Sequence, residues 1–408
     1  MASKQKESKN VDLHGLMKIV IPAALSRVGE QVFVMDHNGD GDSDSDVKKR
    51  VANGFQNGKV QNGVPPCAEA SVPKHVPSIT EIKRAIPSHC FQSEIRHSMY
   101  YVFQDFAFII ALYATVEWLS PLVPTWWQMF ITPVYWMLQG TFFTALFVVG
   151  HDCGHESFSN CSLLNDTIGT LTHTFLWAPY FPWKLSHKHH HKNNNNIDKD
   201  EVFYPIREKW DEGGFLLPGF GLGFGWFGYM FRGYKPRQVF HFDPFDPMLK
   251  EHMVGCLCTY VGLAAWSLCL YHYTATHGLF YLIYHWGVPV FIFATYNVMI
   301  TFLHHTDVDV PWYSDKNWEF VRGQLSSIDR DYGWAHYLIH NIGTHQIHHL
   351  FSKVPHYHLM EATAHFRKAF PELVRYRTDP ILPTFFNMFK KYMEQCVLPD
   401  DTELHVYK

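Results

Sequence analysis

Apolar residues along this chain gather in long runs, and polar residues fill the stretches between them. Four runs are long enough to cross a bilayer as helices, at about 100–119, 126–149, 254–274 and 279–303. The first run contains Asp105 and Glu117, whereas the other three contain no Asp, Glu, Lys or Arg. Short connectors join the runs in pairs, so the pattern predicts an all-α integral membrane protein with four transmembrane helices in two hairpins.

Lysine and arginine are distributed unevenly, and their positions predict an orientation. Thirteen lie in 1–99, ten in 184–251 and eleven in 305–408, whereas 100–183 and 252–304 contain none. Because short cationic segments stay on the cytosolic side of a membrane, we expect both termini and the middle segment to be cytosolic.

Two further apolar segments, 162–183 and 213–231, do not fit this arrangement as spans. If 162–183 crossed the membrane, the histidine-rich sequences before and after it would lie on opposite sides. Its Asp166 and its aromatic and proline residues also favour a helix at the membrane surface. We therefore expect both segments to lie in, or dip into, the interface.

The two ends of the chain differ from this apolar centre. Residues 1–77 are rich in Lys, Asp, Ser, Asn and Gly without sustained periodicity, which predicts a disordered cytosolic tail. Ser78-Ile-Thr-Glu81 predicts a capping box at the start of a short helix that Pro87 ends. We expect one domain over 78–390 and a C-terminal tail over 391–408.

Composition narrows the class of function. The net charge of -4 gives no indication of nucleic-acid binding. The eight cysteines include no CxxC pair, so neither a zinc knuckle nor a disulfide framework is expected. The early residues favour neither a secretory signal nor a plastid transit peptide. Histidine, with 28 residues, is the outlier.

Three histidine clusters stand out. They read His151-Asp-Cys-Gly-His155, His187-Lys-His-His190-His191 and His345-Gln-Ile-His348-His349. Histidines three or four residues apart project from one face of a helix and can bind one metal centre. The clusters supply eight imidazoles, which are too many for one four-coordinate zinc ion and fit two metal ions.

Other polar residues are candidates for the same site. His305, at the end of the fourth run, is a ninth candidate ligand, and His304 competes with it by position alone. His340 is a candidate ligand or a hydrogen-bonding partner of one. Asp152 and Asp307 are candidates to orient a ligand through a hydrogen bond.

The remaining histidines near these motifs have structural interpretations. His189 lies off the face that His187, His190 and His191 share, so we expect it to be a bystander. His272 and His285 lie within predicted spans and are expected to pack or to lie at the interface.

An all-nitrogen ligand set on two metals suits iron that activates dioxygen, while zinc and copper stay open. An apolar route from the bilayer would present a lipid chain to such a site, which predicts oxidation of an unactivated C–H bond. Trp183, Trp136 and Tyr180 are candidate lining residues of that route, although ordinary packing is favoured for each.

The clusters and their flanking sequences strongly resemble membrane fatty acid desaturases of the methyl-end group. The strings ALFVVGHDCGHESFSN, FVRGQLSSIDRDYG and HNIGTHQIHHLFSKVPHYHLMEAT carry the resemblance, which runs from about residue 80 to residue 380. It implies four transmembrane helices under a cytosolic helical cap that holds a di-iron centre. The ligand pattern of the family falls on His151, His155, His187, His190, His191, His305, His345, His348 and His349.

The resemblance also implies a reaction and partners. Dioxygen is the co-substrate as a cis double bond forms in a fatty acyl lipid, and two iron ions are the cofactor. Electrons come from NADH through cytochrome b5 reductase and cytochrome b5, and we expect an endoplasmic reticulum membrane. The chain has no His-Pro-Gly-Gly haem motif, so the donor is expected to be a separate protein. The extra His189 and the run Asn193 to Asn196 depart from the family pattern.

Specificity is less constrained. Asp152 within HDCGH and the string Asn341-Ile-Gly-Thr-His345 favour omega-3 desaturation of linoleoyl-type (omega-6) chains. Delta-12 (oleate) desaturation and a fatty acyl hydroxylase, acetylenase or conjugase stay as alternatives, and the acyl carrier, phospholipid or coenzyme A, is open.

Two features of the sequence, the histidine clusters and a group of basic residues, have alternative interpretations. A histidine-rich metal transporter is disfavoured because the clusters lie outside the spans. Arg232, Lys235 and Arg237 just precede the third run, where they fit either membrane topology or the docking of an acidic cytochrome b5.

Overall fold

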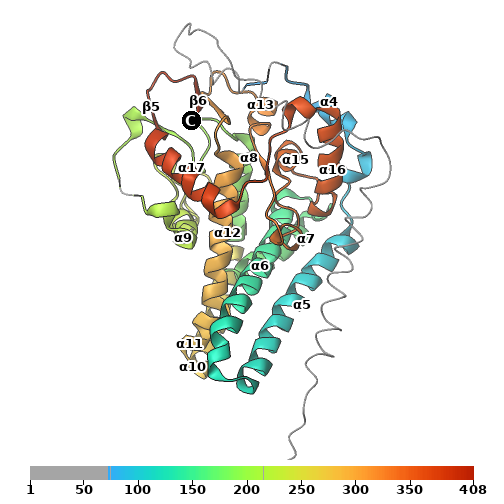
Figure 1. Ribbon diagram of the computed structural model, residues 1–408, viewed down its shortest axis with the longest axis vertical. Coiled ribbons are helices and arrows are strands. Elements are labelled where there is room, and N and C mark those ends of the chain that lie inside the picture. The colour runs from blue at the N-terminus through green and yellow to red at the C-terminus, as the bar shows by residue number, and fades with distance from the viewer. Residues whose placement is uncertain (1–71, 74, 215) are drawn as a thin grey trace, which may run out of the picture. The chain divides into compact units, whose positions relative to one another are not determined.

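The computed structural model of this protein describes residues 72–73, 75–214 and 216–408. The predicted tail over 1–77 falls almost wholly outside the described residues. Within them the fold is mainly helical, and a cap of shorter helices lies at one end of a set of long helices (Figure 1).

The long helices confirm the four predicted spans. They are α5 (Ile95–Leu119), α6 (Gln128–His155), α10 (Met253–His277), and a continuous helix made of α11 (Leu279–Leu282), the π-helical turn η7 (Ile283–Gly287) and α12 (Val288–His305). Among the described residues, these four are long and apolar enough to cross a membrane. Short 3-10 turns extend some of them: η2 (Ser120–Leu122), η3 (Thr125–Trp127) and η6 (Lys250–His252).

The four spans form an inner and an outer pair. In the most apolar window, 61% of the residues of α6 and of the α11–α12 helix are buried, against 22% in α5 and 17% in α10. The outer pair therefore presents apolar side chains outward, as in Phe103 and Val261. Gly140 of α6 permits the close inner contact, because a Cβ there would lie 2.4 Å from the Ile292 side chain.

The segments expected at the interface contain no spanning helix, which confirms that part of the prediction. Residues 162–183 form two helices instead of one, α7 (Ser162–Phe175) and the start of α8 (Tyr180–Lys192). The helical conformation is interrupted at Trp177, whose φ is 57°, and Pro179 directly precedes α8. Both α7 and α8 pack against α6 and α10, and α7 also packs against α8. Segment 213–231 contains only the turn η5 (Pro218–Gly221) and most of α9 (Gly223–Arg232).

The rest of the cap is built from short elements. Its helices are α4 (Ile79–Ala85), α13 (Phe320–Gln324), α14 (Ala335–Leu338), α15 (His345–Leu350), α16 (His356–Ala369) and α17 (Ile381–Gln395). Its 3-10 turns are η1 (Ser88–Phe91), η4 (Glu208–Trp210) and η8 (Pro371–Leu373). Its strands are β1 (Ile206–Arg207), β2 (Pro311–Tyr313), β3 (Asp329–Arg330), β4 (Tyr376–Arg377), β5 (Val397–Leu398) and β6 (Leu404–Val406).

The C-terminal segment is part of this cap, so the prediction of a tail over 391–408 was wrong. β5 pairs with β1 in parallel, and β6 pairs with β2 in the antiparallel direction. Tyr407 is fully buried. The sequence did not indicate these strands, because two or three residues are too few to show an alternating pattern of apolar and polar positions.

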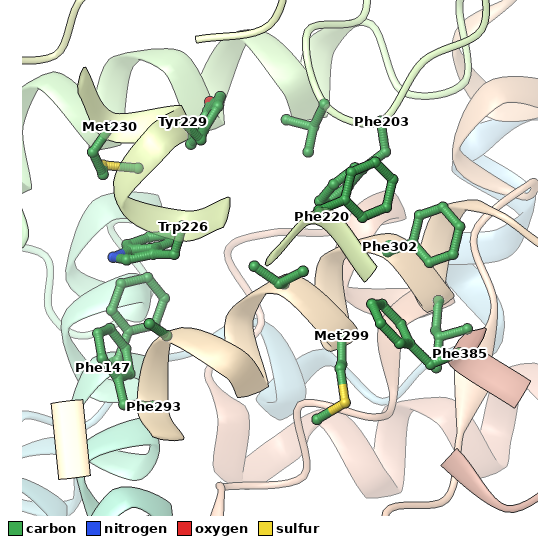
Figure 2. Packing of buried hydrophobic residues seen from close by; sticks show 14 of the residues in the cluster. Phe147, Phe203, Phe220, Trp226, Tyr229, Met230, Phe293, Met299, Phe302 and Phe385 are labelled. Atoms are coloured by element: carbon green, nitrogen blue, oxygen red, sulfur yellow. The ribbon is translucent and has the colours of Figure 1, made fainter. Parts of the chain in front are cut away.

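The two largest of four apolar clusters in the described residues show how the cap is held in place. In the larger one, Trp226 of α9 packs on Phe147 and Phe293 from the inner spans, with ring centroids 5.5 and 5.8 Å apart (Figure 2). In the smaller one, Ile82 and Cys90 from α4 and η1 pack against α15 and α16. Ser78 and Glu81 form the capping box of α4, as predicted.

Candidate metal centre

The ends of α6, α8 and α12 and the short helix α15 bring the predicted histidines together. His151 and His155 lie in the last two turns of α6, and His305 is the last residue of α12. Cluster two occupies the end of α8, and cluster three forms α15. These imidazoles are buried, apart from His187, which is partly exposed. The nine residues therefore occupy one region at the junction of the spans and the cap.

Within this region, five histidines form one group, called here the five-histidine cluster. Each offers a ring nitrogen, and these nitrogens lie within 4.8 Å of one another; the members are His151, His155, His187, His191 and His348. The rings face one another closely, with centroids 4.3 Å apart for His155 and His191. One metal ion fits between them.

The other four, His190, His305, His345 and His349, form a second group, called here the four-histidine cluster. The Nε2 atom of His305 lies 3.2 Å from that of His190 and 3.1 Å from that of His345. His345 Nε2 lies 3.0 Å from His349 Nε2. Two nitrogens that bind one ion at about 2.1 Å and at right angles are separated by about 3.0 Å. The spacing therefore matches ligands converging on a single ion.

Unpaired nitrogens support a metal in the five-histidine cluster. Within the described residues, the buried Nε2 atoms of His155, His187, His191 and His348 have no hydrogen-bond partner. A buried polar atom without a partner is costly. Four such atoms directed at one point are explained by a cation that they bind.

Burial also keeps these imidazoles in the form that binds metals. Desolvation lowers the pKa of His187, His191 and His348 well below the usual 6.5, and the same holds for His345 and His349. The rings are therefore neutral at physiological pH, and a neutral imidazole has a free lone pair for a cation.

Two side chains that the sequence analysis did not single out orient ligands of the four-histidine cluster. His190 Nδ1 donates to Asp200 Oδ1 at 2.8 Å, and Asp200 also accepts from the backbone N of Asn195 and Glu201. His349 Nδ1 donates to Gln324 Oε1 at 3.1 Å, while Gln324 Nε2 donates to the His191 carbonyl. Both contacts leave the Nε2 atom of the ligand directed at the metal.

Asp329 fixes the helix that carries cluster three. Its Oδ1 accepts from the backbone N of His345 and Gln346, the first residues of α15, at 2.6 and 2.8 Å. Arg367 binds its other oxygen. Gln324 and Asp329 lie in the string FVRGQLSSIDRDYG, and Asp200 follows the asparagine run, so a search for polar residues near the clusters had the signal to find them.

The two predicted carboxylates have other contacts. Asp152 accepts from His356 Nδ1 at 2.8 Å and lies 3.6 Å from His151 Nδ1, which is too long for a hydrogen bond. Asp307 pairs with Arg330 and Arg377. Asp152 thus joins the first histidine cluster of the sequence, His151 to His155 (called here box one), to the start of α16. Asp307 fixes the end of α12 instead of orienting a histidine.

The other histidines have partners outside the clusters, although the ring of His304 lies 4.1 Å from that of His345. His340 Nε2 donates to Asp105 at 2.7 Å, which explains a buried acid in the first span. His304 Nδ1 donates to the Ile328 carbonyl, so His305 is the residue of the pair that joins a cluster. His189 is partly exposed beside Glu201. In the fourth span, His285 contacts the Tyr135 hydroxyl.

An apolar cavity opens on both clusters. Its polar lining comes from His151 and His187 of the five-histidine cluster and from His190, His305 and His345 of the four-histidine cluster. Its apolar wall comes from α6, α9 and α12 and includes Phe147, Trp226 and Val298. An aliphatic chain in this cavity would meet the histidines directly.

Of the predicted lining residues, only Trp183 borders this cavity. Trp136 donates to the Tyr284 carbonyl and Tyr180 to Asp166, so both have packing roles. Among the basic residues before the third span, Arg237 is turned inward, where its guanidinium binds the carbonyls of Asp200 and Ile197. These two contacts give Arg237 a structural role within the cap.

Comparison with known proteins agrees with this site. Residues 124–380 match the family described as fatty acid desaturase. An sn-1 acyl-lipid omega-3 desaturase (ferredoxin) of Synechocystis sp. is 39% identical over 321 residues, 76% of this chain and 86% of that protein.

Two plant relatives differ in specificity. An endoplasmic reticulum omega-3 fatty acid desaturase of Vigna radiata is 36% identical over 79% of this chain and 85% of its own length. A delta-12 fatty acid desaturase of Calendula officinalis is 34% identical over 80% of this chain and 91% of its own length. Similar identities to both specificities mean that overall similarity does not separate them.

Proposed function

Because the chain belongs to the fatty acid desaturase family, we propose that it inserts a cis double bond at the omega-3 position of linoleoyl-type (omega-6) acyl chains. The observation that carries this proposal is the apolar cavity that is lined by histidines of both clusters. The omega-3 assignment rests on Asp152 in box one and on the omega-3 relatives.

The nine histidines are the proposed ligands of two iron ions. His151, His155, His187, His191 and His348 would hold one, and His190, His305, His345 and His349 the other. Bound iron would supply dioxygen activation and the oxidising power for an unactivated C–H bond. Asp200 and Gln324 fix the orientation of two rings of the four-histidine cluster, those of His190 and His349.

Chain residues also position the substrate and exclude water. The apolar wall holds the acyl chain through desolvation, while Trp183 and His187, stacked at 4.6 Å, cover the cavity near the five-histidine cluster. The overall reaction converts –CH2–CH2– and dioxygen, with two electrons and two protons, into –CH=CH– and two waters. These electrons are proposed to come from a partner protein.

The proposed donor is a separate cytochrome b5 with its reductase, at the cytosolic face of the endoplasmic reticulum. The distribution of Lys and Arg supports this orientation, and an endoplasmic reticulum relative supports the membrane. The cyanobacterial relatives are named for ferredoxin, so the donor class needs its own test. Purified protein would be supplied with either donor, and turnover only with ferredoxin would overturn the proposal of cytochrome b5.

The reaction is tested by expression in yeast supplied with oleate, linoleate or arachidonate, followed by gas chromatography of the acyl chains. We expect a new double bond in linoleate and arachidonate at the omega-3 position. Conversion of oleate to linoleate alone would assign the delta-12 alternative, which the relative from Calendula officinalis favours. Recovery of only hydroxylated or conjugated products would replace desaturation by one of those reactions.

A further inference from the structure

A second group of metal-binding side chains lies away from the nine histidines. His89 and Cys90 belong to η1, just before the first span, and His358 and Glu361 lie on α16. Their ligand atoms all lie within 4.8 Å of one another. The separation in sequence is about 270 residues, so the cap itself creates this group.

We propose that these four side chains, called here the arm site, bind a structural zinc ion. The set offers one thiolate, two imidazoles and one carboxylate, which are all zinc ligands. Four protein ligands leave no open position, and a closed site is structural, not catalytic. The inference does not depend on the reaction proposed above.

The geometry is close to that of a tetrahedral site. His89 Nε2 lies 3.0 Å from Glu361 Oε2 and 3.7 Å from Cys90 Sγ. Neighbouring ligands of a tetrahedral zinc ion at about 2.0–2.3 Å are separated by about 3.3–3.6 Å. His358 and Glu361 are three residues apart on one helix face, so they reach the same point without rearrangement.

An ordinary ion pair explains only half of the group. It accounts for His89 and Glu361, whose side chains are 55% and 45% exposed. It gives no reason for the thiol of Cys90 and the ring of His358 to converge on the same point. A zinc ion at this point would bind all four side chains, with the sulfur of Cys90 as a thiolate.

The position of the arm site suggests what it stabilises. Cys90 is part of the apolar core that joins α4 and η1 to α15 and α16. α16 begins at His356, which contacts Asp152 of box one. Zinc would therefore clamp the segment before the first span to the helix that follows cluster three.

X-ray absorption at the zinc edge separates this site from the iron centre. We expect purified protein, equilibrated with limiting zinc, to show one sulfur neighbour at about 2.3 Å and three nitrogen or oxygen neighbours at about 2.0–2.1 Å. Zinc that had entered the histidine clusters would show nitrogen alone, because those clusters contain no sulfur ligand.

Variants make the assignment specific. Cys90→Ser should remove the sulfur signal, whereas Cys161→Ser, at an exposed cysteine before α7, should retain it. Glu361→Gln is a milder change at an exposed position and should weaken zinc binding at least about tenfold and lower the melting temperature in zinc by a few degrees. Absence of zinc, a zinc signal without sulfur, or a sulfur signal that survives in Cys90→Ser would overturn the proposal.

Discussion

Both histidine clusters draw on α8 and α15, but α6 contributes only to the five-histidine cluster and α12 only to the four-histidine cluster, and the two are organised differently. In the four-histidine cluster, Asp200 and Gln324 fix two rings by hydrogen bonds, and Nε2 atoms lie 3.0–3.2 Å apart. In the five-histidine cluster, packing dominates: His187 stacks on Trp183, and four buried Nε2 atoms in the described residues have no partner. Hydrogen bonds therefore position the four-histidine cluster, and helix packing positions the five-histidine cluster.

Because of this difference, we expect the two clusters to respond to different substitutions. Loss of an orienting hydrogen bond should affect the four-histidine cluster selectively, because its partners contact only its own rings. The five-histidine cluster should depend on the number of its ligands and on the crossing of α6, α8 and α15. Four experiments with substituted proteins test this contrast.

The largest effect should come from removing one ligand of each cluster. His348→Ala and His305→Ala should each lower bound iron from about two to about one per chain and reduce desaturation about 100-fold or more. Iron content and turnover would be measured on the same preparation, with His189→Ala as the control beside cluster two. Full activity in His348→Ala would remove that residue from the proposed ligand set.

Asp200→Asn should have the next largest effect, and on one cluster only. The substitution keeps the size of the side chain but weakens the acceptor for His190 Nδ1. We expect about a 10- to 100-fold loss of activity with selective loss of the iron in the four-histidine cluster, detected by Mössbauer spectroscopy. Equal loss of both irons would break the contrast between the clusters. Asp401→Asn, at an exposed residue, is the control.

Gln324→Ala should reduce activity about 10-fold. Gln324 holds His349 and also the carbonyl of His191, so its loss frees one ring and one helix end. Iron affinity would be measured by competition with a chelator. An effect as small as that of the control Gln92→Ala, at an exposed glutamine, would show that His349 keeps its orientation through packing alone.

Val298→Phe should have the smallest effect on iron and a clear effect on the substrate. Val298 lines the cavity without belonging to either cluster, so a larger side chain shortens the space for the acyl chain. We expect a several-fold higher KM or a shifted double bond with about two irons retained. Val261→Phe, on the outward face of α10, is the matched control and should leave both unchanged.

The sequence predicted much of this architecture because its signals are local. Long apolar runs predict spans, and all four are present as helices. Nine histidines were selected by their spacing and position, and the structure gathers the same nine. Local signals failed where partners are distant: the strands of the C-terminal segment pair with residues about 90 and 190 positions earlier, and Asp105 pairs with His340.

The division of ligands follows a simple rule that only the structure revealed. Histidines four residues apart share a cluster: His151 with His155, His187 with His191, and His345 with His349. The middle histidine of each HxxHH sequence, His190 or His348, goes to the other cluster. Adjacent residues on a helix point about 100° apart, whereas residues four apart nearly align.

The sequence by itself therefore determined the ligand type, the spacing within each helix and the membrane spans, because these depend on residues close together in the chain. The tertiary structure sorts the nine rings into two clusters, because that depends on how α6, α8, α12 and α15 cross. It also decided that Asp200 and Gln324 support the centre and that His89, Cys90, His358 and Glu361 converge. These contacts join residues that no local pattern connects.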